Sequence, residues 1–359
     1  MPTSWFVDDA DVATIVGFCR SRAIGAGVDP FRYDRLTAGL TTLRDWLPAF
    51  VAIADEDTAI AETAERAGRT ATARQAWRAA TAAAHIANTL PNPDVVAAVA
   101  ADRQAVAAAR RYAALGGVVH HLRPVDGGQR FEGELRLPAG KPDDRPPVAV
   151  IVPGLDSGRA EFLDVADMLL ARGVAVAAID GPGQGSLADE PVEPAYERVT
   201  SAVIDSLTAL DVVDTARVVV IGLSLGGLYA MRSAANDPRV RALATISGAY
   251  PTPEWDALPA FAVDTLTLRC GGTAAAQRVT AALAHPGLPT SVRQPMLVVA
   301  GGADTLPTPA QAKQTAENAP AGELLLVPEG DHLLGNVRWQ WLPRTADWLT
   351  EHATRRVVD

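Results

Sequence analysis

The hydrophobic pattern of the chain changes near residue 118. Before that point, apolar residues recur at helical spacing in alanine-rich segments, and glycine and proline residues separate these segments. Asp94 follows Pro91-Asn92-Pro93 and is a candidate helix N-cap. The predicted helices are Asp8–Arg22, Tyr33–Ala54, Thr70–Leu90 and Asp94–Leu115. We expect residues 1–117 to form a helical N-terminal domain, which is either a packing module or a cap over an active site.

From Val118 onward the pattern is that of short β-strands. Two alternating segments, Val118–Leu122 and Arg130–Leu137, flank Asp126-Gly127-Gly128 and predict a β-hairpin. Continuous apolar runs then alternate with helical segments, as is typical of parallel strands that are buried on both faces. The predicted strands are Val148–Val152, Val174–Ile179, Val218–Ile221, Leu243–Ile246, Met296–Val299 and Leu324–Val327. The predicted helices are Ala160–Arg172, Ala195–Val213, Leu225–Asn236, Pro309–Asn318 and Trp339–Arg355.

The order of these elements predicts an α/β fold with a mostly parallel central sheet. Residues 118–359 would form this second domain. The segment Tyr250–Thr290 interrupts the alternation after the strand that ends near Ser247, so we expect residues 250–290 to be a lid insertion.

Glycines surround one serine at the end of a predicted strand. Gly222-Leu223-Ser224-Leu225-Gly226-Gly227 follows the strand at Val218–Ile221 and precedes a helix. In this setting G-x-S-x-G predicts a nucleophile elbow, in which a sharp turn exposes the serine oxygen. The helix N-terminus behind the serine offers free N–H groups to a developing oxyanion.

An acid and a base follow the serine in the order that this elbow requires. Asp304 comes after the strand at Met296–Val299, and His332 comes after the strand at Leu324–Val327. Both loops would open at the same edge of the sheet as Ser224. We predict a catalytic triad in which His332 is the general base and Asp304 orients it. Asp331 is the alternative acid, but its position beside His332 makes the far ring nitrogen hard to reach.

Two further loops complete the predicted site. The strand at Val148–Val152 ends in Pro153-Gly154-Leu155-Asp156-Ser157, where we expect the N–H of Leu155 to join that of Leu225 in an oxyanion hole. The loop Asp180-Gly181-Pro182-Gly183-Gln184-Gly185 is not G-x-G-x-x-G before a helix, so it does not predict a dinucleotide site.

These motifs together resemble the α/β-hydrolase superfamily. The likeness is to the subgroup with 2,6-dihydroxypseudooxynicotine hydrolase, FrsA-like esterases and fungal polyketide chain-shortening hydrolases. It rests on the long helical N-terminal region, the Gly154-Leu155-Asp156-Ser157 loop, the Asp180–Gly185 loop, the Ser224 elbow, and Asp304 with His332. One departure is Pro153, where many hydrolases carry histidine. The resemblance implies the α/β-hydrolase fold with a helical N-terminal cap.

The resemblance also implies a role for Asp156. Members that cleave C–C bonds have an acidic residue at this position near the serine, although glutamate rather than aspartate is expected there. One hypothesis is that Asp156 positions the substrate or transfers a proton to a carbanion leaving group. The alternative is that Asp156 caps the segment from Arg159 onward by accepting its N–H groups.

Three functions remain open from the sequence. The first is a serine hydrolase that cleaves a C–C bond of a ketone or β-diketone, or an ester, in an aromatic or polyketide-like molecule. The second is a general carboxylesterase, thioesterase or peptidase-like hydrolase. The third is non-hydrolytic: a catalytically silent binding protein, or a cyclase or lyase that reuses the scaffold. Trp77, Trp255 and Phe261 are candidates to line an apolar pocket between the two domains, and the alternative, more common for aromatic residues, is that they only pack in the core.

Composition limits the partners. The chain has 359 residues and a net charge of −10, which argues against nucleic acid and anionic membranes as partners. No apolar run reaches the ~18 residues of a membrane span. Cys19 and Cys270 are the two cysteines, and the N-terminus shows no signal-peptide pattern, so we expect a cytoplasmic protein. We expect no metal and no cofactor, a small-molecule substrate, and a homodimer. His85 is interpreted as a packing or surface residue.

Overall fold

The structure is a computed structural model, and it describes residues 12–125, 127–140, 145–248, 250–251 and 254–355. The predicted helix start at Asp8, the turn residue Asp126 and part of the predicted lid lie outside the described residues. Within these ranges, none of the helices has the length and apolar character needed to cross a membrane.

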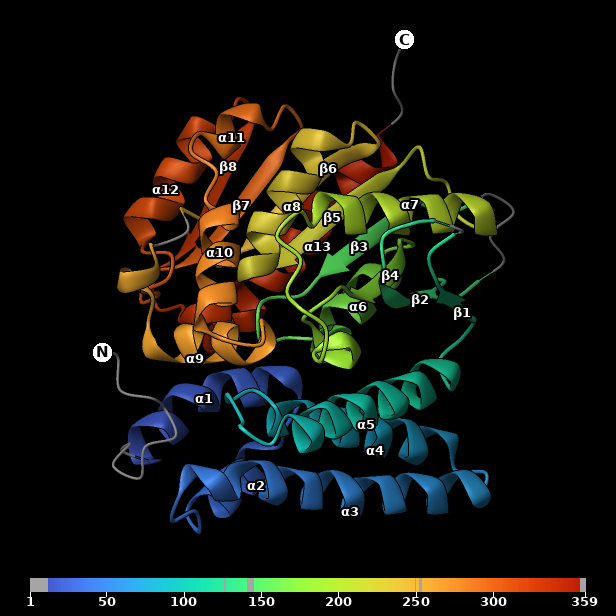
Figure 1. Cartoon of the computed structure of the whole chain (residues 1–359). Helices are drawn as coiled ribbons and strands as arrows, with labels where there is room; N and C mark the ends of the chain where they lie inside the picture. Colours follow the sequence, from blue (N-terminus) through green and yellow to red (C-terminus); the bar gives the residue numbers. More distant parts are fainter. Residues whose placement is uncertain (1–11, 126, 141–144, 249, 252–253, 356–359) are drawn as a thin grey trace.

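The first part of the chain forms an N-terminal helical layer, which lies at one end of the molecule (Figure 1). Its helices are α1 Val12–Ala26, α2 Pro30–Thr37, α3 Trp46–Arg66, α4 Thr70–Ala87 and α5 Val95–Ala114, with a 3-10 turn η1 at Leu43–Asp45. Asp94 caps α5 as predicted, because its side chain accepts the N–H of Ala97 at 3.0 Å.

The predicted single helix at Tyr33–Ala54 is wrong, because the chain turns between α2 and α3. Thr42 accepts the N–H of Arg44 and starts the intervening 3-10 turn. The turn folds α2 back on α3, so that Tyr33 and Trp46 bury their rings against each other, 6.2 Å apart between centroids. Burial of two aromatic side chains outweighs the helix propensity of the segment between them.

An eight-stranded sheet forms the second layer, in the order β1-β2-β4-β3-β5-β6-β7-β8. The hairpin strands β1 and β2 are antiparallel to their neighbours, and all later pairs are parallel. The strands are β1 Val119–Leu122, β2 Glu132–Arg136, β3 Val148–Val152, β4 Ala175–Asp180, β5 Val218–Leu223, β6 Val240–Ile246, β7 Met296–Gly301 and β8 Gly322–Val327. These agree with the predicted strands to within about three residues at either end.

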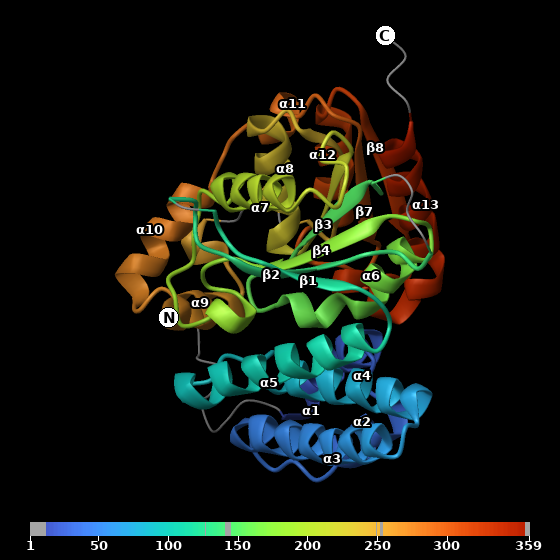
Figure 2. The ribbon, with the colours of Figure 1, turned by 90° about the vertical axis from the view of Figure 1, so that its right-hand side faces the viewer.

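Helices cover both faces of the sheet, as Figure 2 shows. One apolar cluster includes α7 Glu197–Leu210, α8 Leu225–Asn236 and α12 Pro309–Asn318, and the other includes α6 Leu163–Leu170 and α13 Arg338–Thr354. The five residues of β3 are fully buried between them. The segment predicted as an insertion contains α9 Ala260–Arg269, α10 Thr273–Leu283 and α11 Leu288–Ser291, and α9 faces the N-terminal helical layer (Figure 1).

Helix α1 packs directly on the loop that follows β8. That loop contains the 3-10 segment η5 at His332–Val337. A Cβ added at Gly335 would lie 2.5 Å from the carbonyl oxygen of Ser21 in α1. One at Gly25 would lie 3.2 Å from the Cα of Gly335. The two glycines therefore permit a close backbone approach between the beginning of the described chain and a loop near its end.

A buried carboxylate lies inside the helical layer. Asp102 of α5 is 4% exposed, and its Oδ2 accepts a hydrogen bond from Nδ2 of Asn88 at 2.6 Å. Burial raises its pKa to about 7, although the positive charge of Arg269 opposes this shift. The ionised form of Asp102 is therefore disfavoured in the folded protein.

The raised pKa of Asp102 predicts that the stability of the fold depends on pH. The folded pKa lies above the ordinary value of 3.8, so the unfolded chain releases this proton at a lower pH than the folded chain does. The contribution of Asp102 to stability is then lost as pH rises from about 4 to about 7. We expect Asp102→Asn to raise Tm more at pH 8 than at pH 5.

The exposed Asp55 is a matched control, because its carboxylate also accepts an amide N–H, from Gln104 at 2.8 Å. The effect of Asp55→Asn on Tm should be the same at both pH values. An equal gain for Asp102→Asn at pH 5 and pH 8 would contradict this account.

Alanine substitution of two glycines, one at the contact of α1 with this loop and one elsewhere in α1, should change the free energy of unfolding in opposite directions. Gly335→Ala should lower the free energy of unfolding by about 1–3 kcal/mol, because the added methyl group collides with backbone. Gly17→Ala should raise it by about 0.5–1 kcal/mol, since Gly17 is exposed within α1 and an added Cβ meets nothing within 4 Å. Urea unfolding of the two variants measures both effects. Unchanged stability of Gly335→Ala would show that α1 does not rest on this loop.

Candidate active site

Ser224 lies on a strained turn between β5 and α8. Its φ of 55° and ψ of −124° lie outside the regions that non-glycine residues ordinarily occupy. A Cβ at Gly222 would lie 2.0 Å from the carbonyl oxygen of Gly226, and one at Gly226 would lie 2.1 Å from that of Val152. Only glycine fits at these two positions, so the sequence pattern produces the sharp turn that was predicted.

His332 connects the serine to a buried aspartate. Its Nε2 lies 3.0 Å from Oγ of Ser224, and its Nδ1 lies 3.1 Å from both carboxylate oxygens of Asp304. Asp304 is 4% exposed and also accepts the N–H of Leu306 at 2.9 Å. Burial alone would raise its pKa, but the hydrogen bond from His332 more than compensates, and the pKa is lowered overall. The partner of Nδ1 is Asp304, so the alternative acid Asp331 does not take this place.

Ser247, at the end of β6, holds the histidine loop. Its Oγ accepts the N–H of Leu333 at 2.9 Å, and its hydroxyl also interacts with Asp304. Leu333 and Leu334 have φ values of 64° and 50°, in the left-handed region that residues other than glycine rarely adopt. In the sequence Ser247 marks only the end of a strand, and its contact with the histidine loop could not be predicted, because nothing in the local pattern distinguishes it.

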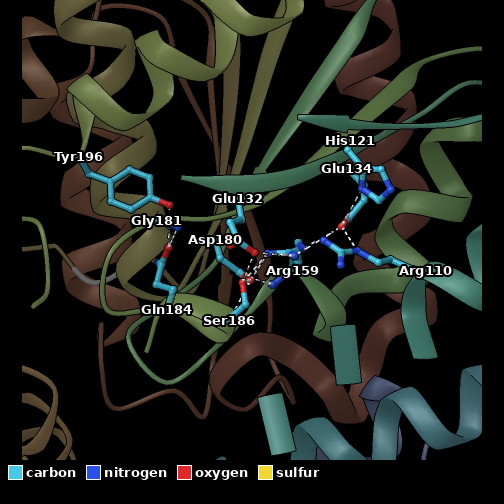
Figure 3. Close-up of polar contacts among 10 residues, drawn as sticks. All are labelled: Arg110, His121, Glu132, Glu134, Arg159, Asp180, Gly181, Gln184, Ser186 and Tyr196. Carbon is cyan, nitrogen blue, oxygen red and sulfur yellow. Dashed lines mark hydrogen bonds and ion pairs between the residues drawn. The ribbon is translucent and has the colours of Figure 1, made fainter. Parts of the chain in front are cut away.

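The loop after β3 also lies close to Ser224. A Cβ at Gly154 would lie 3.1 Å from Cβ of Ser224. Nε2 of Gln184 donates to the carbonyl oxygens of Pro153 and Gly154, at 2.7 and 3.0 Å. Figure 3 shows the amide end of Gln184 directed toward Gly181 and the hydroxyl of Tyr196, which both donate to its Oε1. The backbone on the N-terminal side of Leu155 is therefore fixed, and Leu155 and Leu225 both line the cavity at Ser224.

The buried guanidinium of Arg159 connects this loop to the sheet. Figure 3 shows Arg159 between Asp180 and Glu134, and Nε donates to Glu134 at 2.8 Å. Asp180 also accepts the backbone N–H of Arg159 at 2.7 Å. The prediction that Asp156 caps this segment is therefore wrong, because Asp180 accepts that N–H instead.

Asp156 instead pairs with Arg22 of α1. Nη1 of Arg22 donates to Oδ2 of Asp156 at 2.6 Å, and Nη2 donates to Oγ of Ser157 at 3.0 Å. Nε donates to Glu161 at 2.7 Å, and Glu161 contacts Nε2 of His85 at 2.9 Å. His85 is thus a buried packing residue with a charged partner. The place of Arg22 in this cluster could not be predicted from the sequence, because Arg22 lies in a predicted helix with no motif around it.

Charge and burial act against each other in this cluster. Burial disfavours the charged form of Arg22, but the charges of Asp156 and Glu161 raise its pKa well above the ordinary value. Burial would likewise raise the pKa of Glu161, whereas Arg22 and His85 hold it well below its usual range. The opposite charges of Arg22 and Glu161 therefore offset the cost of burying both groups.

A mainly apolar cavity of about 250 Å³ lies against Ser224 and His332. It is lined by α1, α9, α10 and the loops described above, and Arg22 and Asp156 are among its polar lining residues. Phe261 lines it as predicted, whereas Trp77 and Trp255 do not. Its apolar lining residues are Phe18, Leu90, Leu155, Leu225, Leu258, Phe261, Ala262, Leu266, Leu283 and Leu306. Such a space suits a small, largely apolar ligand.

No metal-binding cluster occurs in the part of the chain that the structure describes. There, no group of three or more His, Cys, Asp or Glu side chains is arranged to hold a metal ion. The polar groups at the cavity are suited to proton transfer and anion stabilisation by side chains and backbone.

Comparison with known proteins gives consistent matches. The family model of the alpha/beta hydrolase family matches residues 149–342. The chain is 34% identical over 227 residues to 2,6-dihydropseudooxynicotine hydrolase of Paenarthrobacter nicotinovorans, which covers 60% of this chain and 59% of that enzyme. It is 40% identical over 135 residues to Hydrolase LUC6 of a Fusarium species, which covers 35% of this chain and 32% of that protein. The matched segments thus span less than two thirds of the length of these relatives.

A solved structure extends the likeness to nearly the whole chain. The crystal structure of the 2,6-dihydroxy-pseudo-oxynicotine hydrolase superposes with a TM-score of 0.80 at 26% identity. The superposition covers 93% of this chain and 95% of that one. The N-terminal helical layer and the sheet therefore occur together in both structures.

Gln184 generates a prediction about the loop after β3. Gln184→Met removes the donor to Pro153 and Gly154 while it keeps the side-chain volume. The Gly185 N–H, which donates to the carbonyl oxygen of Ser157 in this loop at 3.2 Å, should then exchange at least about tenfold faster. Hydrogen exchange read by mass spectrometry or NMR measures this.

Gln294→Met is the matched control, because Gln294 also donates to a backbone carbonyl, that of Ala234, at 2.7 Å. It should leave exchange at Gly185 unchanged. Equal protection of Gly185 in the wild type and in Gln184→Met would show that Gln184 does not restrain this loop.

Proposed function

Because the chain belongs to the alpha/beta hydrolase family, we propose that it is a serine hydrolase that cleaves small carbonyl compounds with Ser224, His332 and Asp304. The fold class predicted from the sequence is confirmed by the same match and by the solved structure. One observation carries the proposal: hydrogen bonds run without a break from Ser224 through His332 to the buried Asp304. This is the geometry in which a serine hydroxyl becomes a nucleophile.

The proposed reaction proceeds in two steps. Oγ of Ser224 attacks the substrate carbonyl carbon while Nε2 of His332 accepts the hydroxyl proton. The tetrahedral oxyanion accepts hydrogen bonds from the N–H groups of Leu155 and Leu225. The bond to the leaving group then breaks, and His332 returns the proton to that group. Water next attacks the acyl-enzyme with His332 as base, which releases the acid and restores Ser224.

Asp304 supports the charge that forms on His332 during this cycle. Its lowered pKa favours the carboxylate form, which accepts the Nδ1–H and stabilises the imidazolium. The N–H of Leu306 donates to Asp304, and this contact together with the near-complete burial of Asp304 fixes the orientation of the carboxylate.

We propose an aromatic or polyketide-like substrate of small size. The apolar lining and the volume of about 250 Å³ support this class. Both the cleavage of an ester and that of a ketone or β-diketone begin with the same attack by Ser224. In the second case the leaving group is a carbanion stabilised as an enolate. The named 2,6-dihydropseudooxynicotine hydrolase among the relatives supports a small-molecule substrate.

The domain roles follow from what encloses the cavity. We propose that the N-terminal helical layer is a cap and that residues 250–290 form a lid, because α1, α9 and α10 all contribute to the cavity wall. The two cysteines, Cys19 and Cys270, are buried and free, which supports the proposed cytoplasmic location. The homodimer stays a prediction.

Ser224→Ala tests the proposed function. Intact-protein mass after treatment with a fluorophosphonate should show one adduct on the wild type and none on Ser224→Ala. Hydrolysis of a p-nitrophenyl ester or a small β-diketone should fall by at least about a thousandfold in the variant.

Ser291→Ala is the matched control, because Ser291 is an exposed serine at the end of α11. It should keep both the adduct and the hydrolysis. A wild type that forms no adduct and hydrolyses neither substrate would overturn the serine-hydrolase proposal and favour a cyclase or lyase.

A further inference from the structure

We propose that Arg22 is a positioning residue that, from the N-terminal helix, holds the Leu155 N–H in place to stabilise the oxyanion. This inference rests on the proposed function, since it concerns the same reaction. It goes beyond that function because it makes helix α1, about 130 residues away in the chain, a working part of the oxyanion hole.

The contacts of Arg22 converge on the backbone that directly follows Leu155. Nη1 donates to the carboxylate of Asp156 at 2.6 Å, and Nη2 reaches the carbonyl oxygen of Asp156 at 3.4 Å. Nη2 also donates to the hydroxyl of Ser157 at 3.0 Å. One planar group thus binds two consecutive residues through both side chains and backbone, which limits the rotation of the peptide units beside Leu155.

Gln184 restrains the same loop from the other side of Leu155. It binds the carbonyl oxygens of Pro153 and Gly154, the two residues that precede Leu155. Leu155 therefore lies between two fixed points, one from the core and one from the N-terminal helical layer. An N–H group aimed in advance at a developing charge stabilises it without reorganisation, and this is the requirement of an oxyanion hole.

Arg22 is itself held rigidly. Its Nε and Nη2 donate to the two carboxylate oxygens of Glu161 at 2.7 and 2.9 Å, and Glu161 is 2% exposed. His85 of α4 contacts the same carboxylate at 2.9 Å. The guanidinium is therefore fixed between two carboxylates before any substrate binds, and its orientation is passed on to Asp156.

This arrangement gives Asp156 a role that differs from both sequence hypotheses. Its carboxylate oxygen accepts from Arg22, so Asp156 acts on the loop through that pair. A side chain as short as aspartate brings the loop close to α1. The amide of asparagine would keep an oxygen that accepts from Arg22, whereas alanine would not.

Helix α1 also contacts the substrate space. Phe18 lines the cavity one turn before Arg22, and its ring lies 6.2 Å from that of Phe261 in α9. The same helix therefore shapes the cavity and holds the loop after β3. Substrate fit against α1 and the geometry of the oxyanion hole are coupled through one rigid element.

Arg22→Lys tests the proposal in the full-length protein. Lysine keeps the positive charge, but its three donors lie on one nitrogen and cannot reproduce the five contacts that the three guanidinium nitrogens make to Asp156, Ser157 and Glu161. We expect kcat for a p-nitrophenyl ester to fall about 10- to 100-fold, with KM within about threefold of the wild-type value. The rate of fluorophosphonate labelling should fall by a similar factor. Arg78→Lys is the matched control, since Arg78 pairs across the same interface with Asp167 and lies outside the cavity, and it should keep wild-type kcat.

Variants of Asp156 keep the test valid if Arg22→Lys unfolds. Asp156→Asn should keep at least about a third of kcat, and Asp156→Ala should lose about tenfold or more, with Tm measured for each. Wild-type kcat in Arg22→Lys or in Asp156→Ala would overturn the proposal. So would a rise in KM alone, which indicates substrate binding rather than loop positioning. A large loss in Asp156→Asn equal to that in Asp156→Ala would assign proton transfer to Asp156 instead. An inactive, unlabelled wild type would refute the proposed function and not this inference alone.

Discussion

The loop after β3 has no regular secondary structure, so its backbone direction depends on side chains that bind it from outside. Gln184 and Arg22 bind the loop from two different elements, and Asp180 holds its C-terminal end by accepting the N–H of Arg159. A free loop of this length would sample many conformations, and the N–H of Leu155 would face the serine in few of them. Ser224, in contrast, is held in place by regular secondary structure, because it lies at the junction of a buried strand and a helix. The precision of the proposed oxyanion hole therefore rests on buried polar contacts rather than on the sheet itself.

Such contacts are costly as a source of stability. Moving Arg22, Glu161 and Arg159 out of water carries a desolvation penalty that can exceed the Coulombic attraction between the partners. Apolar side chains of the same volume would pack as well in the interface between the N-terminal helical layer and the sheet. They would not fix a peptide unit in one orientation, whereas a guanidinium with several acceptors does. We therefore attribute the polar side chains of this interface to the peptide units that they orient.

The sequence predicted those parts of the molecule whose signals are local. The strands follow from apolar runs, the elbow from its glycines, and the order of Ser224, Asp304 and His332 from the loops that follow three strands. What it missed depends on contacts between distant residues: Arg22 with Asp156, and Ser247 with Leu333. The break between α2 and α3 was missed for a related reason, since the burial of Tyr33 against Trp46 decides it and no local pattern shows that contact.

The contacts of helix α1 imply that the candidate active site is assembled late in folding. The helix rests on Gly335 beside the histidine loop and binds Asp156 beside the serine, so residues near both ends of the described chain meet at one place. Contacts of such long sequence separation form late and slowly during folding. A chain still being synthesised, or one cut within either end, would hold Ser224 on an intact strand yet lack the groups that direct it. The proposed turnover would then report on complete assembly of the chain.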